Sequence, residues 1–247
     1  MLLIGVEQVI HQRFIKMFLL IINFFEIVTA IFGTVYIKKY REDKISRYFV
    51  YFLWFTALFD TFFGWMPSLI ENYDQLFFLK DTFLYKNHWA YNSYDIISFS
   101  FYLFFFLNFI ESTKAKKIGV YSIILFIVTS LLNLILSGVF FESPALFSLI
   151  LGTLLLLFFI IYFYFQVLQS DKILDFYKIL VFYISVGALV FHILVNPIFI
   201  YGEYYSNTKS PEFVEIYRSI LTFANIFMYT CYTIGFIVCS RKNRSYY

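Results

Sequence analysis

Charged residues are scarce in this chain. Asp, Glu, Lys and Arg make up 14% of its 247 residues, whereas soluble domains carry about 25%. Hydrophobic residues make up 61% and the mean hydropathy is +0.76, and a soluble chain of this length cannot bury so much apolar surface in one core. The shortage of charge therefore excludes soluble enzymes, disordered chains and nucleic-acid readers. The net charge of +3 is modest, so we expect no nucleic-acid partner.

Cysteine and histidine are also few. Cys231 and Cys239 lie in one apolar stretch and offer neither a disulfide framework nor a metal-ligand cluster. His11, His88 and His192 form no His-x-x-x-His pair, and catalytic zinc usually takes three protein ligands. The chain also has no Gly-x-Ser-x-Gly elbow, phosphate-binding glycine loop or Cys-x-x-Cys pair. We therefore identify no catalytic residue and expect no metal and no cofactor.

What the chain has in abundance is long apolar runs. A helix needs about 20 apolar residues to cross a bilayer, and runs such as Leu154–Ile161 are apolar on every side, unlike the strands of a barrel. We predict an all-α polytopic membrane protein that forms a single domain over residues 1–247. The seven predicted spans are Met17–Ile37, Tyr48–Ile70, Tyr94–Ser112, Ile118–Phe140, Pro144–Gln166, Ile179–Tyr201 and Ile216–Ser240.

The basic residues predict the orientation. Most Lys and Arg residues follow spans one, three, five and seven, and cytoplasmic segments are the ones enriched in these residues. The amino terminus is then outside and the carboxyl terminus is cytoplasmic. The first span has no small-x-small cleavage site after it, so we expect it to stay in the mature protein.

Two outer connections, Glu71–Ser93 and Gly202–Glu215, are longer than the rest. The first is studded with aromatic residues, which anchor at the lipid headgroups. A lid over a ligand is the alternative interpretation of this loop.

Ionisable and amide side chains inside the spans are the candidate site. A charge inside a bilayer costs at least a few kcal/mol, so it usually faces the bundle interior or a wet cavity. The predicted topology puts Glu26 near the middle of the membrane and most of the others toward the outer side. The candidate ligand-binding residues are Glu26, Asp60, Asp95, His192, Asn196 and Asn225.

Spacing along the helices supports polar faces. Asn23 lies three residues before Glu26, and Gly64 lies four residues after Asp60, where it permits close helix approach. In span six, His192 and Asn196 share a face, and we expect Pro197 to bend the helix beside them. The structural alternative is that Asn23, Asn133 and Asn225 only join helices through hydrogen bonds.

Other familiar sites are absent. The last span has no lysine before Lys242 that could hold retinal, and no Asp-Arg-Tyr follows span three. Two segments stand out: Asn87–Asn92 enters a Phe-rich span, and Gly235–Cys239 precedes a basic tail. In these segments and in its overall pattern, the chain resembles uncharacterised seven-helix inner-membrane proteins from AT-rich bacterial genomes. The resemblance implies a bacterial inner (plasma) membrane as the location, and it implies no activity.

Four functions remain open. The first is a non-enzymatic receptor that binds a small or lipid-like ligand in an outer polar cavity and signals to a cytoplasmic or membrane protein partner. The second is a transporter or channel subunit in which Glu26 and Asp60 carry protons or cations. We rank it lower because polar residues are fewer toward the inner side. A structural subunit of a membrane complex is the third, and a metal hydrolase that uses Asp60, Asp95, His88 and His192 is the least favoured.

Overall fold

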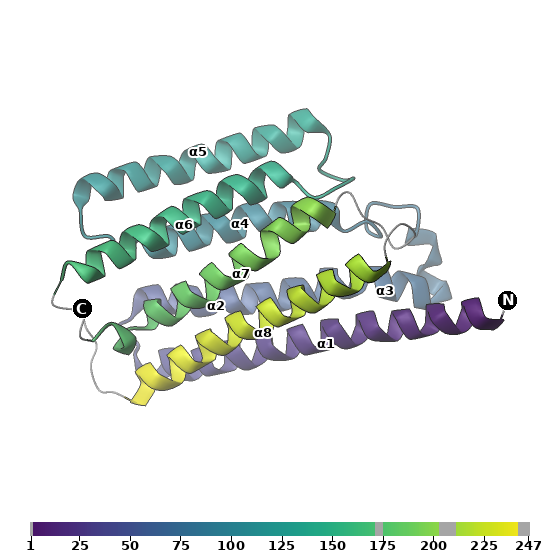
Figure 1. Cartoon of the computed structure of the whole chain (residues 1–247), viewed down its shortest axis with the longest axis horizontal. Coiled ribbons are helices and arrows are strands. Elements are labelled where there is room, and N and C mark those ends of the chain that lie inside the picture. The colour runs from purple at the N-terminus through teal and green to yellow at the C-terminus, as the bar shows by residue number, and fades with distance from the viewer. Residues whose placement is uncertain (1, 171–174, 203–210, 242–247) are drawn as a thin grey trace.

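The computed structural model describes residues 2–170, 175–202 and 211–241, and every regular element in these residues is helical. The long helices run back and forth along one axis, so their connections gather at two ends (Figure 1). The elements are α1 (Leu2–Lys39), α2 (Lys44–Phe59), the π-helix η1 (Asp60–Gly64), α3 (Trp65–Asn72), the 3₁₀-helix η2 (Asp74–Leu79), α4 (His88–Leu107), α5 (Thr113–Ser137), α6 (Leu146–Leu168), the 3₁₀-helix η4 (Phe176–Lys178), α7 (Leu180–Gly202) and α8 (Pro211–Arg241).

Six helical segments among the described residues are long and apolar enough to cross a membrane, which makes the chain an all-α polytopic membrane protein. They are Lys16–Lys39, Lys44–Asn72, Thr113–Ser137, Leu146–Leu168, Leu180–Tyr201 and Phe213–Arg241. The sequence predicted seven, and α4 is the helix that falls short. Its first turns carry His88, Asn92 and Asp95, which dilute the apolar residues that follow.

The ends of several helices differ from their predicted positions, for local reasons. The third predicted span, Tyr94–Ser112, is instead a helix from His88 to Leu107, and Ser112 is the N-cap residue of the next helix. The Ser112 side chain accepts a hydrogen bond from the Ala115 amide (3.4 Å) and so caps α5. At its other end α5 stops before Gly138, whose φ of 73° favours glycine.

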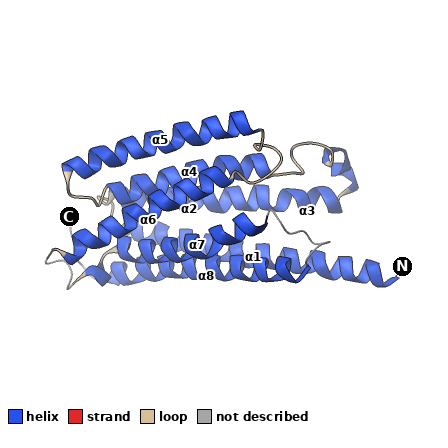
Figure 2. Ribbon diagram, turned by 45° about the horizontal axis from the view of Figure 1, so that its top comes forward, coloured by secondary structure: helices blue, strands red, loops and turns tan. Residues whose placement is uncertain are grey.

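The helices form a ring with one helix outside it. Around the ring, α1 packs against α2, α2 against α4, α4 against α6, α6 against α7, α7 against α8, and α8 against α1. Helix α5 packs on the outside against α4 and α6, and it lies at the edge of the bundle in both ribbon views (Figures 1 and 2). The interior of the ring is therefore where a site enclosed by several helices can form.

Basic residues gather at the end of the bundle that holds the carboxyl end of α8, which we call the basic end. It comprises Lys38–Arg47, Lys114–Lys117, Lys178 and Arg241, and the Lys39 Nζ donates to the Ser240 carbonyl (2.5 Å) to join α1 to α8 there. Lys172, Lys242 and Arg244, which the orientation prediction also used, lie outside the described residues, as does 203–210 of the second long connection.

Candidate functional site

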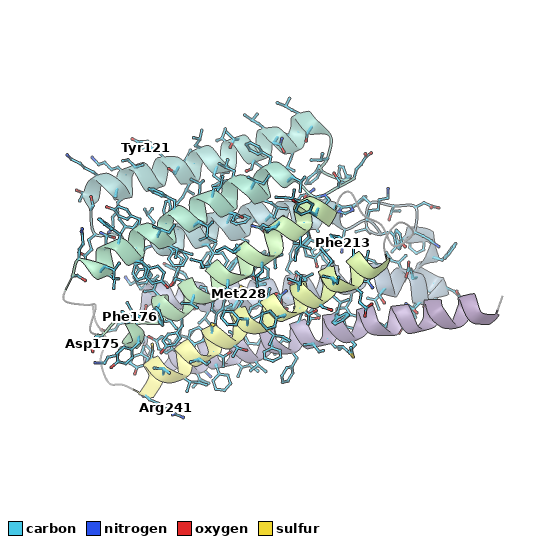
Figure 3. The ribbon with its side chains drawn as sticks, in the orientation of Figure 1. Tyr121, Asp175, Phe176, Phe213, Met228 and Arg241 are labelled. Atoms are coloured by element: carbon cyan, nitrogen blue, oxygen red, sulfur yellow. The ribbon has the colours of Figure 1, made fainter. Side chains whose placement is uncertain are left out.

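A cavity of about 590 Å³ lies inside the ring of helices. Side chains from α1, α2, η1, α4, α6, α7 and α8 line it, and none of the lining residues comes from α5. On α8 the lining reaches from Phe213 to Met228, and Figure 3 places Phe213 near the start of that helix, Met228 near its middle and Arg241 at the basic end. Fifteen residues of helix correspond to about 22 Å, so the cavity occupies the half of the bundle remote from the basic end.

An aromatic plug closes the cavity toward the basic end. It consists of Phe49, Phe105, Tyr232 and Phe236, each at most 1% exposed. The ring of Phe49 lies 5.1 Å from that of Phe105 and 5.3 Å from that of Tyr232, between ring centroids. On α2, α4 and α8, the plug residues lie nearer the basic end than the residues that line the cavity. The described core is therefore closely packed between the cavity and the basic end.

The Glu26 carboxyl lies behind the cavity wall. It is 1% exposed, and it accepts hydrogen bonds from Asn23 Nδ2 (3.0 Å) and from the Tyr229 hydroxyl (3.2 Å). Trp65 Nε1 donates to Asn23 Oδ1 (2.8 Å), which extends this network to α3. Asn23 and Tyr229 themselves line the cavity, whereas Glu26 does not. Glu26 is thus in contact with the wall without being part of it.

Asp60 connects this network to the cavity. Its carboxyl lies close enough to the Glu26 carboxyl and the Tyr91 hydroxyl to interact electrostatically with both, and Asp60 lines the cavity. Two neighbouring carboxyls can share a proton, because an ionised carboxylate only accepts hydrogen bonds. The second oxygen, Oδ1 of Asp60, is buried and has no hydrogen-bond partner among the described residues.

The regular α-helical hydrogen bonding is interrupted at Asp60. Pro67 has no amide hydrogen to donate to the Phe63 carbonyl four residues earlier, and the π-helix η1 precedes it. Asn87 Nδ2 donates to that carbonyl instead (2.9 Å). A Cβ atom added to Gly64 would lie 3.2 Å from the Tyr91 hydroxyl, so the glycine leaves room for this partner of Asp60.

The opposite wall comes from α7 and α8. The His192 side chain is 7% exposed and lies among aromatic rings, with a centroid distance of 4.8 Å to Phe99. Its Nδ1 has no hydrogen-bond partner among the described residues. Asn196 donates to Thr153 on α6, and Asn225 Nδ2 donates to the Leu221 carbonyl of its own helix (2.9 Å). Helix α7 continues through Pro197 to Gly202, so this proline does not end it.

Five of the six candidate residues line the same cavity: Asp60, Asp95, His192, Asn196 and Asn225. Sequence reasoning missed the α4 wall, to which Tyr91, Ser98 and Tyr102 contribute beside Asp95. The signal was present, because residues 91, 95, 98 and 102 are spaced by three and four and therefore share one face of a helix. The predicted connection Glu71–Ser93 is partly helical, because α4 begins at His88, and it contributes Asn87, His88, Tyr91 and Asn92 to the wall.

A hydrogen bond outside the predicted spans joins the loop before α4 to α3. The Tyr85 hydroxyl donates to the Glu71 carboxylate (2.5 Å), and this hydrogen bond to an anion raises the pKa of Tyr85. Phe77, Phe78 and Phe83 of the same loop are exposed, as residues at a lipid headgroup layer are.

Metal-ligating residues do not cluster in the described part of the chain: no three or more His, Cys, Asp or Glu side chains are grouped so as to hold an ion. Comparison of the chain with known protein families, curated proteins and solved structures found no match. The chemistry of the cavity is therefore the basis for a function.

Proposed function

We propose that this chain is a membrane receptor that takes a small or lipid-like ligand into the cavity from the end remote from the basic loops. The observation that carries the proposal is the one-ended cavity. It is wide enough for a small molecule, mostly apolar, and furnished with a few convergent polar groups, which is the usual form of a ligand site.

The proposed receptor crosses the membrane seven times. Helix α4 is taken as a seventh span, because ten of its 20 residues are buried and its polar residues line the cavity, away from lipid. The basic end is taken as cytoplasmic, in a bacterial inner membrane, since Lys and Arg mark cytoplasmic loops. The amino terminus is then outside.

Signal transmission would run through α8. Its residues Met228 and Tyr229 contact the cavity, and its far end reaches the basic end at Arg241. A ligand that displaces α8 would move the junction with α1 at Lys39 and Ser240. A cytoplasmic or membrane protein partner docked on the basic loops would read this movement.

Proton-coupled transport is the second candidate. The contact between the Glu26 and Asp60 carboxyls favours it, because a proton held there could leave and return. The aromatic plug ranks it lower, since the buried rings of Phe49, Phe105, Tyr232 and Phe236 lie between the cavity and the basic end.

Filling the cavity tests the proposal. Leu221 lines it, so Leu221→Trp should occupy the space of the ligand. The matched control is Leu154→Trp, because Leu154 is 60% exposed on the outside of α6. Native mass spectrometry of protein purified in mild detergent should find a bound small molecule in the wild type and in Leu154→Trp, and should find it lost from Leu221→Trp.

Two results would count against a ligand cavity. One is a wild-type protein without any bound molecule under conditions that keep lipids attached. The other is an equal bound mass in both tryptophan variants.

A further inference from the structure

The charged side chains that line the described cavity wall are acidic. Asp60 and Asp95 both line it, and Asp95 lies near enough to Asp60 for their charges to interact. Within the described part of the chain, no Lys or Arg is among the lining residues. A carboxylate in a low-dielectric interior is costly unless a cation accompanies it. The wall therefore has acidic groups and no basic side chain of its own.

Two basic side chains, Lys86 and Arg218, stand beside the wall and are not part of it. Lys86 acts electrostatically on His88, and Arg218 acts on Tyr217, at the end of the cavity remote from the plug. Both positions lie next to lining residues along the chain. The described lining residues therefore supply no cation to face Asp60 and Asp95 across the cavity, and a ligand can supply one.

Two buried polar atoms at the cavity lack partners among the described residues. These are Oδ1 of Asp60, on one side, and Nδ1 of His192, on the other. A buried polar atom left unsatisfied costs about 1–3 kcal/mol. A ligand with polar groups at two positions would satisfy both atoms.

Aromatic rings supply the rest of the wall. Tyr91, Tyr94, Phe99 and Tyr102 line it from α4, and Phe191 lines it from α7. Ring faces attract a cation that lies within about 6 Å, and they pack well against an apolar body. The wall thus favours a ligand that is both positively charged and apolar.

We propose that the cavity binds a small cationic amine with an apolar body, its ammonium group against Asp60 and Asp95 and a second polar group near His192. This proposal rests on the function proposed above and names its ligand class. The amine supplies the countercharge that the wall lacks, and its apolar part covers the aromatic rings.

Three probes of similar shape and different charge test the ligand class: phenethylamine, phenethyl alcohol and hydrocinnamate, which are cationic, neutral and anionic. Binding to the full chain in lipid nanodiscs is measured by isothermal titration calorimetry. We expect the amine to bind roughly tenfold or more tightly than the alcohol, because charge-assisted hydrogen bonds exceed neutral ones. Hydrocinnamate should bind most weakly, since Asp60 and Asp95 repel it.

Matched variants test which carboxylates bind the ammonium group of the amine. Asp60→Asn and Asp95→Asn should each weaken amine binding roughly tenfold and leave alcohol binding nearly unchanged. Asp74→Asn is the control, because Asp74 is an exposed residue of η2 and not a lining residue. If Asp60→Asn does not give a monodisperse protein, Asp95→Asn decides the question.

The outcomes separate the ligand class from the function. Equal binding of amine and alcohol, tighter binding of hydrocinnamate, no binding of any probe, or an equal effect of Asp74→Asn overturns the amine proposal. If the alcohol binds and Leu221→Trp abolishes its binding, the ligand cavity stands with a different ligand class. If Leu221→Trp leaves amine binding intact, the cavity is not the site and the proposed function fails with it.

Discussion

The Glu26 carboxyl is the most deeply buried of the acidic groups at the site, and its neighbours explain how a helix can keep it there. Asn23 and Tyr229 donate to its two oxygens, and the i, i+3 relation predicted for Asn23 and Glu26 is confirmed by their hydrogen bond. The structural alternative for the asparagines fits only partly. Asn23 joins α1 to α3 through Trp65, whereas Asn225 bonds to its own helix.

Removing one donor to Glu26 should destabilise the protein. Tyr229→Phe deletes the hydroxyl and leaves one buried carboxyl oxygen with fewer partners, which costs about 1–3 kcal/mol in the free energy of unfolding. The control is Tyr121→Phe, because Tyr121 is 72% exposed on α5 and lies at the rim of the bundle (Figure 3). Unfolding by SDS in mixed micelles measures both, and equal stabilities of the two variants would contradict this account of Glu26.

The helical segment Lys44–Asn72 is one span with a change of hydrogen-bond register inside it. The sequence predicted a span over Tyr48–Ile70, and the structure adds the π-helix at Asp60–Gly64. The partner that takes the Phe63 carbonyl is Asn87, from a loop after the span. No pattern inside the span itself could have identified this partner.

A double-mutant cycle tests that register. Asn87→Ala should cost about 1–3 kcal/mol of unfolding free energy, because the Phe63 carbonyl loses its donor. In a Pro67→Ala background the cost should shrink, since an alanine at this position has an amide hydrogen that can donate to the same carbonyl. Asn108→Ala is the control, because Asn108 is exposed and donates to its own helix at Phe104. Strictly additive effects of the Asn87 and Pro67 changes would rule out this coupling.

Helix α4 decides the topology of the whole molecule. If it crosses the membrane, the loop before it and the start of α5 after it lie on opposite sides; if it does not, they lie on the same side. Phe78, which is 73% exposed, and the exposed Lys116 flank this helix. They are suitable positions for a labelling experiment.

Cysteine labelling should find the two positions on opposite sides. In a background with Cys231→Ala and Cys239→Ala, a membrane-impermeant maleimide added to intact cells should label Phe78→Cys, and should label Lys116→Cys only after the membrane is opened. Labelling of both positions from outside would remove α4 from the spans. Labelling of Lys116→Cys alone would invert the proposed orientation.

The sequence alone determined that the protein is an all-α polytopic membrane protein, because the free energy of transferring a helix into lipid adds up residue by residue along each apolar run. It also identified five of the residues that line the cavity. Only the tertiary structure decided that Glu26 lies behind the wall while Tyr91, Ser98 and Tyr102 form part of it. The rotation of each helix toward its neighbours depends on side-chain packing between segments far apart in the chain, and a polar residue in a span has the same hydropathy whichever way it faces.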